Sequence, residues 1–234
     1  MMEGLKLVET LLPEDMARAN FYGLLARLFY APPDAALLEG LAAAEELAAD
    51  EGVMGDAWQA LAKAAAVADI EAVREAYESA FIGTGKAPVT LYTTAYTLRC
   101  SNEMPLVALR ADLAALGLAR HESSHEPEDH IAALCDAMRH LITTQKLELS
   151  QQSQFFSRWI APAAQPLCDA IARQRNSTFY EHVAGFAKAF FELERSAFEM
   201  FAAGTPRRFE SSNRLGINLV SKPGHYVGGG PHET

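Results

Sequence analysis

Apolar residues recur at helical spacing along most of the chain, and polar or proline-containing segments separate the helical stretches. The first stretch opens with Pro13-Glu14-Asp15 and carries apolar side chains every three or four residues until Ala31-Pro32-Pro33. Asp69 is a favourable N-cap for a later helix, and Gly117 is suited to end another. The periodicity predicts helices over residues 13–30, 34–50, around Trp58, 70–81, 104–116, 127–149, 154–175 with interruptions near Pro162 and Pro166, and 178–202.

One stretch departs from the helical pattern. Residues 89–98, with the sequence VTLYTTAYTL, are rich in β-branched and aromatic residues and would locally favour a strand. A single strand among helices has no sheet to join, so we expect a short helix or an extended loop. The chain is therefore expected to be all-α, with one globular helical domain over residues 1–204. The glycine-rich, aperiodic residues 205–234 predict a flexible C-terminal extension.

Composition supports the helical expectation and shows an uneven charge. Alanine, the best helix former, accounts for 42 of the 234 residues. The net charge is −10, yet residues 201–234 carry four basic and two acidic side chains, which leaves −12 on residues 1–200. Such an acidic body argues against binding to nucleic acid or to an anionic membrane surface, and it favours a basic partner.

The sequence also predicts a cytoplasmic protein. No apolar run approaches the roughly 20 residues of a membrane span, and the acidic N-terminal segment has no signal-peptide core. The three cysteines, Cys100, Cys135 and Cys168, form no CxxC pair, a pattern typical of a reducing compartment. Cys135 stands among apolar residues and is expected to be a buried structural thiol.

Motifs for catalysis or metal binding fail on spacing. His125 and His130 are five residues apart, about 140° around a helix, whereas a helical zinc pair needs a separation of four. The loop Gly83-Thr84-Gly85-Lys86 lacks both the first glycine and the final Ser/Thr of a phosphate loop. No GxSxG nucleophile motif is present. We therefore expect no metal, no cofactor and no enzymatic activity.

A dense polar cluster, Glu126-Pro127-Glu128-Asp129-His130, stands at a predicted helix start. Pro127 is expected at the first helical position, with Asp129 and His130 in the first turn beside exposed N–H groups. Two interpretations stay open. In the first, the acidic residues only cap the helix. In the second, Asp129 and His130 face a groove and hold a cationic peptide, for which an arginine is the natural partner.

This cluster, followed by Ile131, Leu134 and Met138, resembles the E-P-x-D-H signature of the TorD/DmsD/NarJ family of molybdoenzyme maturation chaperones. The resemblance extends over about residues 14–200. It includes Phe21-Tyr22 with the leucines that follow, Tyr77-Glu-Ser-Ala-Phe81, Pro88 with Leu91-Tyr92-Thr-Thr-Ala-Tyr96, Leu106 to Arg110, Gln154-Phe155-Phe156-x-x-Trp159 and Phe179-Tyr180.

The resemblance implies a family-specific fold of about ten helices, in two halves joined by a hinge near 119–126. It implies a cytoplasmic chaperone that binds the twin-arginine signal peptide or the apo form of a molybdopterin-containing oxidoreductase, assists cofactor insertion and delays export. A monomer or a domain-swapped homodimer is expected. The implied peptide-binding residues are Glu126, Pro127, Asp129 and His130, with Tyr22, Tyr77, Phe81, Tyr92 and Tyr96 as candidates for an apolar wall.

Two points stay open at this stage. A helical bundle that binds a nucleotide or a metal, or that acts as an enzyme on a small ligand, is the alternative function. The tail contains Arg207-Arg208, which loosely mimics a twin-arginine motif. One hypothesis is that the tail folds back on the acidic body and competes with a client peptide, and the alternative is an incidental arginine pair.

Overall fold

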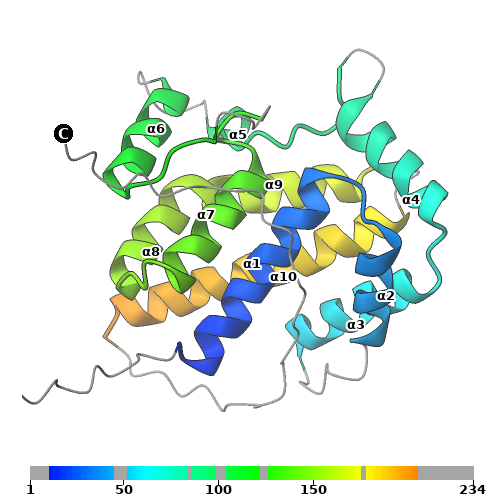
Figure 1. Cartoon of the computed structure of the whole chain (residues 1–234), viewed down its shortest axis with the longest axis horizontal. Coiled ribbons are helices and arrows are strands. Elements are labelled where there is room, and N and C mark those ends of the chain that lie inside the picture. Colours follow the sequence, from blue (N-terminus) through cyan, green and yellow to red (C-terminus); the bar gives the residue numbers. More distant parts are fainter. Residues whose placement is uncertain are drawn as a thin grey trace, which may run out of the picture.

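The computed structural model of the chain describes residues 11–44, 52–83, 86–97, 104–121, 126–174 and 178–204. Regular structure in these residues is helical, which confirms the all-α class (Figure 1). None of the described helices is long and apolar enough to cross a membrane. The elements are α1 (Pro13–Tyr30), α2 (Ala35–Ala43), α3 (Val53–Ala66), α4 (Ile70–Tyr77), α5 (Thr94–Thr97), α6 (Pro105–Ala115), α7 (Ile131–Thr143), α8 (Leu149–Phe155), α9 (Ala161–Ala172) and α10 (Thr178–Ala202), with π-helical turns η2 (Glu78–Ile82) and η3 (Phe156–Ile160).

Several helix ends lie where the sequence predicts them. The Asp69 carboxylate accepts a hydrogen bond of 2.9 Å from the Ala72 N–H and caps α4. Gly117 follows α6 with a φ of +68°, the left-handed conformation that glycine adopts without strain. Residues 90–93 are extended and lead into the short helix α5, as expected for the 89–98 stretch. The predicted hinge at 119–126 and the extension 205–234 lie largely or wholly outside the described residues.

The helix at the polar cluster is shorter than its periodicity predicts. It begins at Ile131 instead of Pro127 and ends at Thr143 instead of near residue 149. A turn with Lys146 at a φ of +48° follows Thr143 and precedes α8. The predicted interruptions near Pro162 and Pro166 are milder than expected. A π-helical turn precedes Pro162, and Pro166 lies inside α9.

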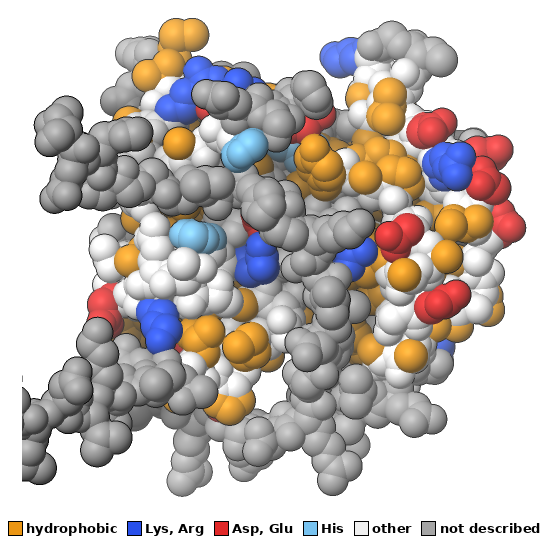
Figure 2. Space-filling model, in the orientation of Figure 1, with side chains coloured by type: hydrophobic (Ala, Val, Ile, Leu, Met, Phe, Trp, Pro, Cys, Tyr) orange, Lys and Arg blue, Asp and Glu red, His pale blue; other side chains and the backbone are white. Residues whose placement is uncertain are grey.

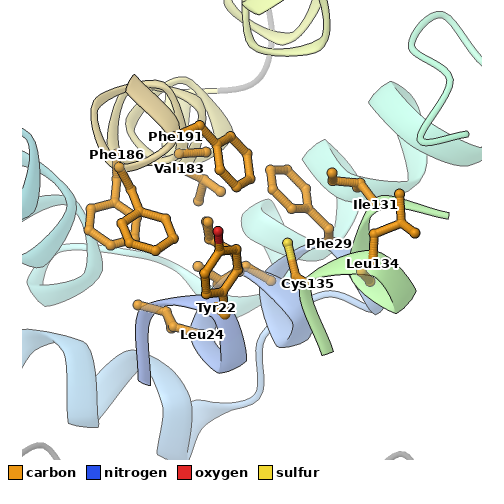
Figure 3. Close-up of a cluster of buried hydrophobic side chains, with 14 of the residues drawn as sticks. Tyr22, Leu24, Phe29, Ile131, Leu134, Cys135, Val183, Phe186 and Phe191 are labelled. Atoms are coloured by element: carbon orange, nitrogen blue, oxygen red, sulfur yellow. The ribbon is translucent and has the colours of Figure 1, made fainter. Parts of the chain in front are cut away.

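The core forms where α1 packs against α7 and α10. Figure 3 shows Tyr22 and Phe29 of α1 among Leu134 and Cys135 of α7 and Phe191 of α10. All five side chains are buried. Burial raises the pKa of the Cys135 thiol, so this cysteine is the inert structural thiol that the sequence predicts.

The helices α1 and α7 approach each other closely at Gly23. A Cβ atom at this position would lie 2.9 Å from Cδ of Arg139 on α7. The absence of a side chain at Gly23 therefore leaves room for the Arg139 side chain, which packs from the C-terminal half of α7 against the middle of α1.

A buried ion pair joins α1 to α10. Nε and Nη2 of Arg18 donate to the two carboxylate oxygens of Glu194, at 2.7 and 2.8 Å. The Tyr22 hydroxyl donates to the same carboxylate at 2.9 Å, and Asp15 binds the third guanidinium nitrogen. The Glu194 side chain is only 3% exposed. Each polar group of this network has a partner, which is the condition for burying charge without a large loss of stability.

Replacing Glu194→Gln should lower the free energy of unfolding by about 3 kcal/mol, because it leaves the Arg18 charge without its buried counter-charge. Urea denaturation of the purified protein measures this loss. The matched control is Glu192→Gln, which removes an exposed carboxylate paired with Arg195 on the same helix and should cost less than about 0.5 kcal/mol. Equal losses in the two variants would show that the buried pair has no special role.

Candidate functional site

The polar cluster forms a turn that is bonded to the segment before α5. The Thr93 N–H donates to the Asp129 carbonyl at 2.8 Å, and the Ile131 N–H donates to the Leu91 carbonyl at 2.8 Å. These bonds make an isolated antiparallel bridge between Tyr92 and His130. Because His130 has an extended backbone conformation (φ −63°, ψ 130°) and the residues on either side of it bond to residues 91 and 93, α7 begins at Ile131 instead of Pro127. We refer to Glu126–His130 as the acidic turn.

Asp129 and His130 hold the acidic turn from inside. Both residues are buried, at 4% exposure each. The Asp129 carboxylate accepts a hydrogen bond from the Thr94 hydroxyl. His130 is the N-cap of α7, because its Nδ1 accepts the Ala132 N–H at 3.2 Å. The N-cap of α7 is thus the imidazole of His130, whereas one interpretation of the sequence had the acidic residues as caps.

Glu126 and Tyr92 form the outward-facing part of the turn. The Tyr92 hydroxyl donates to the Glu126 carboxylate at 2.8 Å, and the Tyr92 ring packs edge-to-face on His130 with centroids 5.6 Å apart. Tyr92 is 38% exposed and Glu126 is half-buried. Burial, together with the hydrogen bond to Glu126, raises the pKa of Tyr92 to about 12. Tyr92 therefore stays a protonated donor to Glu126 at neutral pH.

Tyr77 lies within electrostatic range of Glu126 and is bonded to the end of α1. The Tyr77 hydroxyl donates to the backbone carbonyls of Phe29 and Tyr30, at 3.1 and 2.9 Å. Burial raises the pKa of Tyr77, and the nearby negative charge of Glu126 adds to the effect. Tyr30 itself is 56% exposed. The carboxylate is thus close to aromatic side chains, a combination that attracts cations both by charge and by the ring faces.

Glu128 is bonded to basic side chains of the chain itself. Its carboxylate accepts a hydrogen bond of 3.0 Å from Nη2 of Arg110 on α6, and Nε of Arg120 lies 3.9 Å away. Burial alone would raise the pKa of Glu128, but the hydrogen bond and charge of Arg110, with Arg120, lower it overall. Glu128 is therefore an ionised group whose charge is balanced within the protein.

The structure brings together some of the residues that the sequence proposed for binding and separates others. Glu126, Asp129, His130 and Tyr92 meet at the acidic turn, and Pro127 lies within it. The remaining aromatic candidates are not at the surface of the turn. Tyr22 is fully buried against α10, Phe81 packs on Phe29 and Tyr180, Tyr77 is buried, and the half-buried Tyr96 donates to the Thr90 carbonyl. A peptide-binding role for these residues stays a prediction.

Sequence reasoning missed the partners that fix the turn. Thr94 and Arg110 bond its carboxylates. The sequence does contain a signal for Thr94, because an isolated β-branched stretch needs another segment to bond. It contains none for Arg110, since that contact does not follow from local periodicity.

The face around the turn combines apolar and charged side chains. Figure 2 shows apolar side chains gathered above the C-terminal end of α1, with a histidine on one side and acidic side chains over α2 and α4 on the other. In the described residues, no group of three or more His, Cys, Asp or Glu side chains could hold a metal ion.

The segment with Arg207-Arg208 lies outside the described residues, so its competition with a client peptide stays a hypothesis.

His130 should make stability depend on pH. Burial lowers the pKa of His130, although the carboxylates of Glu126 and Asp129 oppose this. The unfolded chain therefore binds the proton more readily, so the stabilisation is present above pH 6.5 and is lost as the pH falls. His130→Asn keeps a capping side chain without this titration. Urea denaturation at pH 7.5 and 5.5 measures the free energy of unfolding, which should fall less between these pH values in the variant than in wild type. His182→Asn, which replaces an exposed histidine, is the control. If the free energy of unfolding fell equally in His130→Asn and in wild type, the role of His130 in the pH dependence would be contradicted.

Comparison with known proteins gives the family. The model of the nitrate reductase delta subunit family matches residues 47–192, more than half of the chain, and covers α3 to most of α10, including the acidic turn. No curated protein matches the chain. Members of the matched family are maturation chaperones for molybdoenzymes of the nitrate reductase type rather than catalytic enzymes. With more than half of its length matched, the chain belongs to the nitrate reductase delta subunit family, which agrees with the resemblance found in its sequence.

Proposed function

We propose that this protein is a cytoplasmic chaperone that binds the twin-arginine signal peptide, or the apo form, of one molybdopterin-containing oxidoreductase. Binding assists insertion of the cofactor and delays export of the client until it is mature. The protein acts by binding and carries out no chemical step. A monomer or a domain-swapped homodimer remains the expected state.

The pair of Glu126 and Tyr92 is the observation that carries this proposal. It presents an anionic carboxylate, oriented by a phenol that stays protonated, at a half-exposed position. A planar guanidinium can bond such a carboxylate and stack on a neighbouring ring at the same time. The exposed rings of Tyr30 and Tyr92 offer apolar surface to the hydrophobic part of a leader peptide.

The buried members of the turn support this surface without touching the peptide. Asp129, bonded to Thr94, and His130, capping α7, fix the backbone on which Glu126 stands. Their effect on binding would therefore come through the position of the turn. An Asp129 variant is expected to lose stability together with affinity, because its carboxylate and its carbonyl both bond the 93–94 segment.

Replacing Glu126→Gln should weaken binding of a synthetic leader peptide with two adjacent arginines by about 3- to 10-fold, because the half-exposed charge is removed. The amide still accepts the Tyr92 hydroxyl, so the melting temperature should stay within about 2 °C of wild type. Isothermal titration calorimetry measures the affinity, and thermal unfolding followed by circular dichroism measures the stability.

The matched control is Glu71→Gln on α4, an exposed carboxylate paired with Arg74 on the same molecule. It changes the net charge equally and should leave the affinity unchanged. Wild-type protein that binds no arginine-bearing leader would contradict the proposed function. Equal weakening in both variants would show that overall charge, and not the acidic turn, attracts the peptide.

A further inference from the structure

Glu128 already holds a guanidinium from the chain itself. Its side chain is 10% exposed, whereas the side chain of Arg110, which donates to it at 3.0 Å, is 52% exposed. Arg120, 41% exposed, lies within 3.9 Å of the other carboxylate oxygen. The carboxylate is thus fixed in the turn, and its basic partners face water.

The geometry of the contact between Arg110 and Glu128 allows another arginine to replace Arg110. Elsewhere in the molecule, Arg18 binds Glu194 through two nitrogens, with both side chains largely buried. Arg110 reaches Glu128 through one nitrogen from a half-exposed side chain. The exposed arginine of such a single-contact pair is held less firmly than Arg18, and another guanidinium can take its place on the same carboxylate.

The position of Glu128 makes such a replacement relevant to binding. Glu128 stands two residues from Glu126 in the acidic turn, and Asp129 between Glu128 and α7 is buried and bonded to Thr94. A cationic segment bound at Glu126 therefore has Glu128 as its next carboxylate along the turn. That carboxylate is reached only by displacing Arg110.

We propose that Arg110 is an intramolecular competitor, whose guanidinium occupies Glu128 until an arginine of the bound client segment displaces it. The inference rests on the proposed function and adds a regulatory contact to the same site. Helix α6 stays attached during the exchange. Asp112 accepts hydrogen bonds of 2.9 Å from Nη1 of Arg158 and from Nε1 of Trp159, and Leu109 and Leu113 are buried.

Competition of this kind discriminates between clients. A segment with one arginine would bind Glu126 and leave Arg110 in place. In a segment with two arginines, the second arginine would bind Glu128. It would add to the affinity only the difference between its own contact and the Arg110 contact that it replaces. Removing Arg110 should therefore improve binding of the two-arginine segment more than binding of the one-arginine segment.

The test compares Arg110→Met with wild type, using a leader peptide with adjacent arginines and the same peptide with one arginine replaced by glutamine. Calorimetric titration should show the two-arginine peptide binding about 2- to 5-fold more tightly to the variant, the range expected for an exposed ion pair. The one-arginine peptide should change less. Arg110→Lys, which keeps the charge beside Glu128, should bind both peptides as wild type does.

Arg74→Met is the matched control, because it removes an equally exposed arginine, paired with Glu71 on α4, that does not bind Glu128. It should leave the affinity unchanged. Adding Glu128→Gln to Arg110→Met should abolish the gain, as a double-mutant cycle requires for a direct contact. Unchanged or weaker binding by a folded Arg110→Met protein, or an equal gain in Arg74→Met, would overturn the competitor role while leaving the proposed function intact. No binding by wild type would overturn both.

Discussion

The backbone bridge between residues 91–93 and 129–131 is the constraint on which the acidic turn depends. Two hydrogen bonds of 2.8 Å join the segments, and they move the start of α7 from Pro127 to Ile131. The same bridge brings Tyr92 beside Glu126 and lets His130 cap the helix. Without it, the polar cluster would continue as an ordinary first helical turn, and Tyr92 would not be held beside Glu126.

The three acidic residues of the turn differ in their partners, and the partners decide what each can do. Asp129 is buried and bonded to a threonine hydroxyl, so it fixes the backbone. Glu128 is balanced by arginines of the chain itself. Glu126 accepts from a neutral phenol at a half-exposed position. The three carboxylates of the turn thus differ in their burial and in their hydrogen-bond donors, although the net charge of the region suggests three equivalent sites.

The sequence predicts the fold well and the site only in part, for physical reasons. Long amphipathic stretches such as Thr178–Ala202 repeat a pattern that burial alone requires, so their ends are predictable. The cluster at Glu126–His130 is recognisable from its residues. Its geometry depends on contacts with Thr94 and Arg110, which lie 35 and 18 residues away from the carboxylates they bond. Local sequence patterns contain no information on such contacts. For this reason the sequence alone does not separate buried aromatic residues such as Tyr22 from exposed ones such as Tyr92 in the predicted binding site.

Photo-cross-linking of a leader peptide with a benzophenone group next to its two arginines tests the central claim most directly. Mass spectrometry of the digested product locates the attachment. The acidic turn as the binding surface predicts cross-links within residues 91–97 and 126–131, lost when unlabelled peptide is added in excess. Cross-links confined to α2 and α3, on another part of the molecule, would contradict the assignment of the acidic turn as the client-binding site.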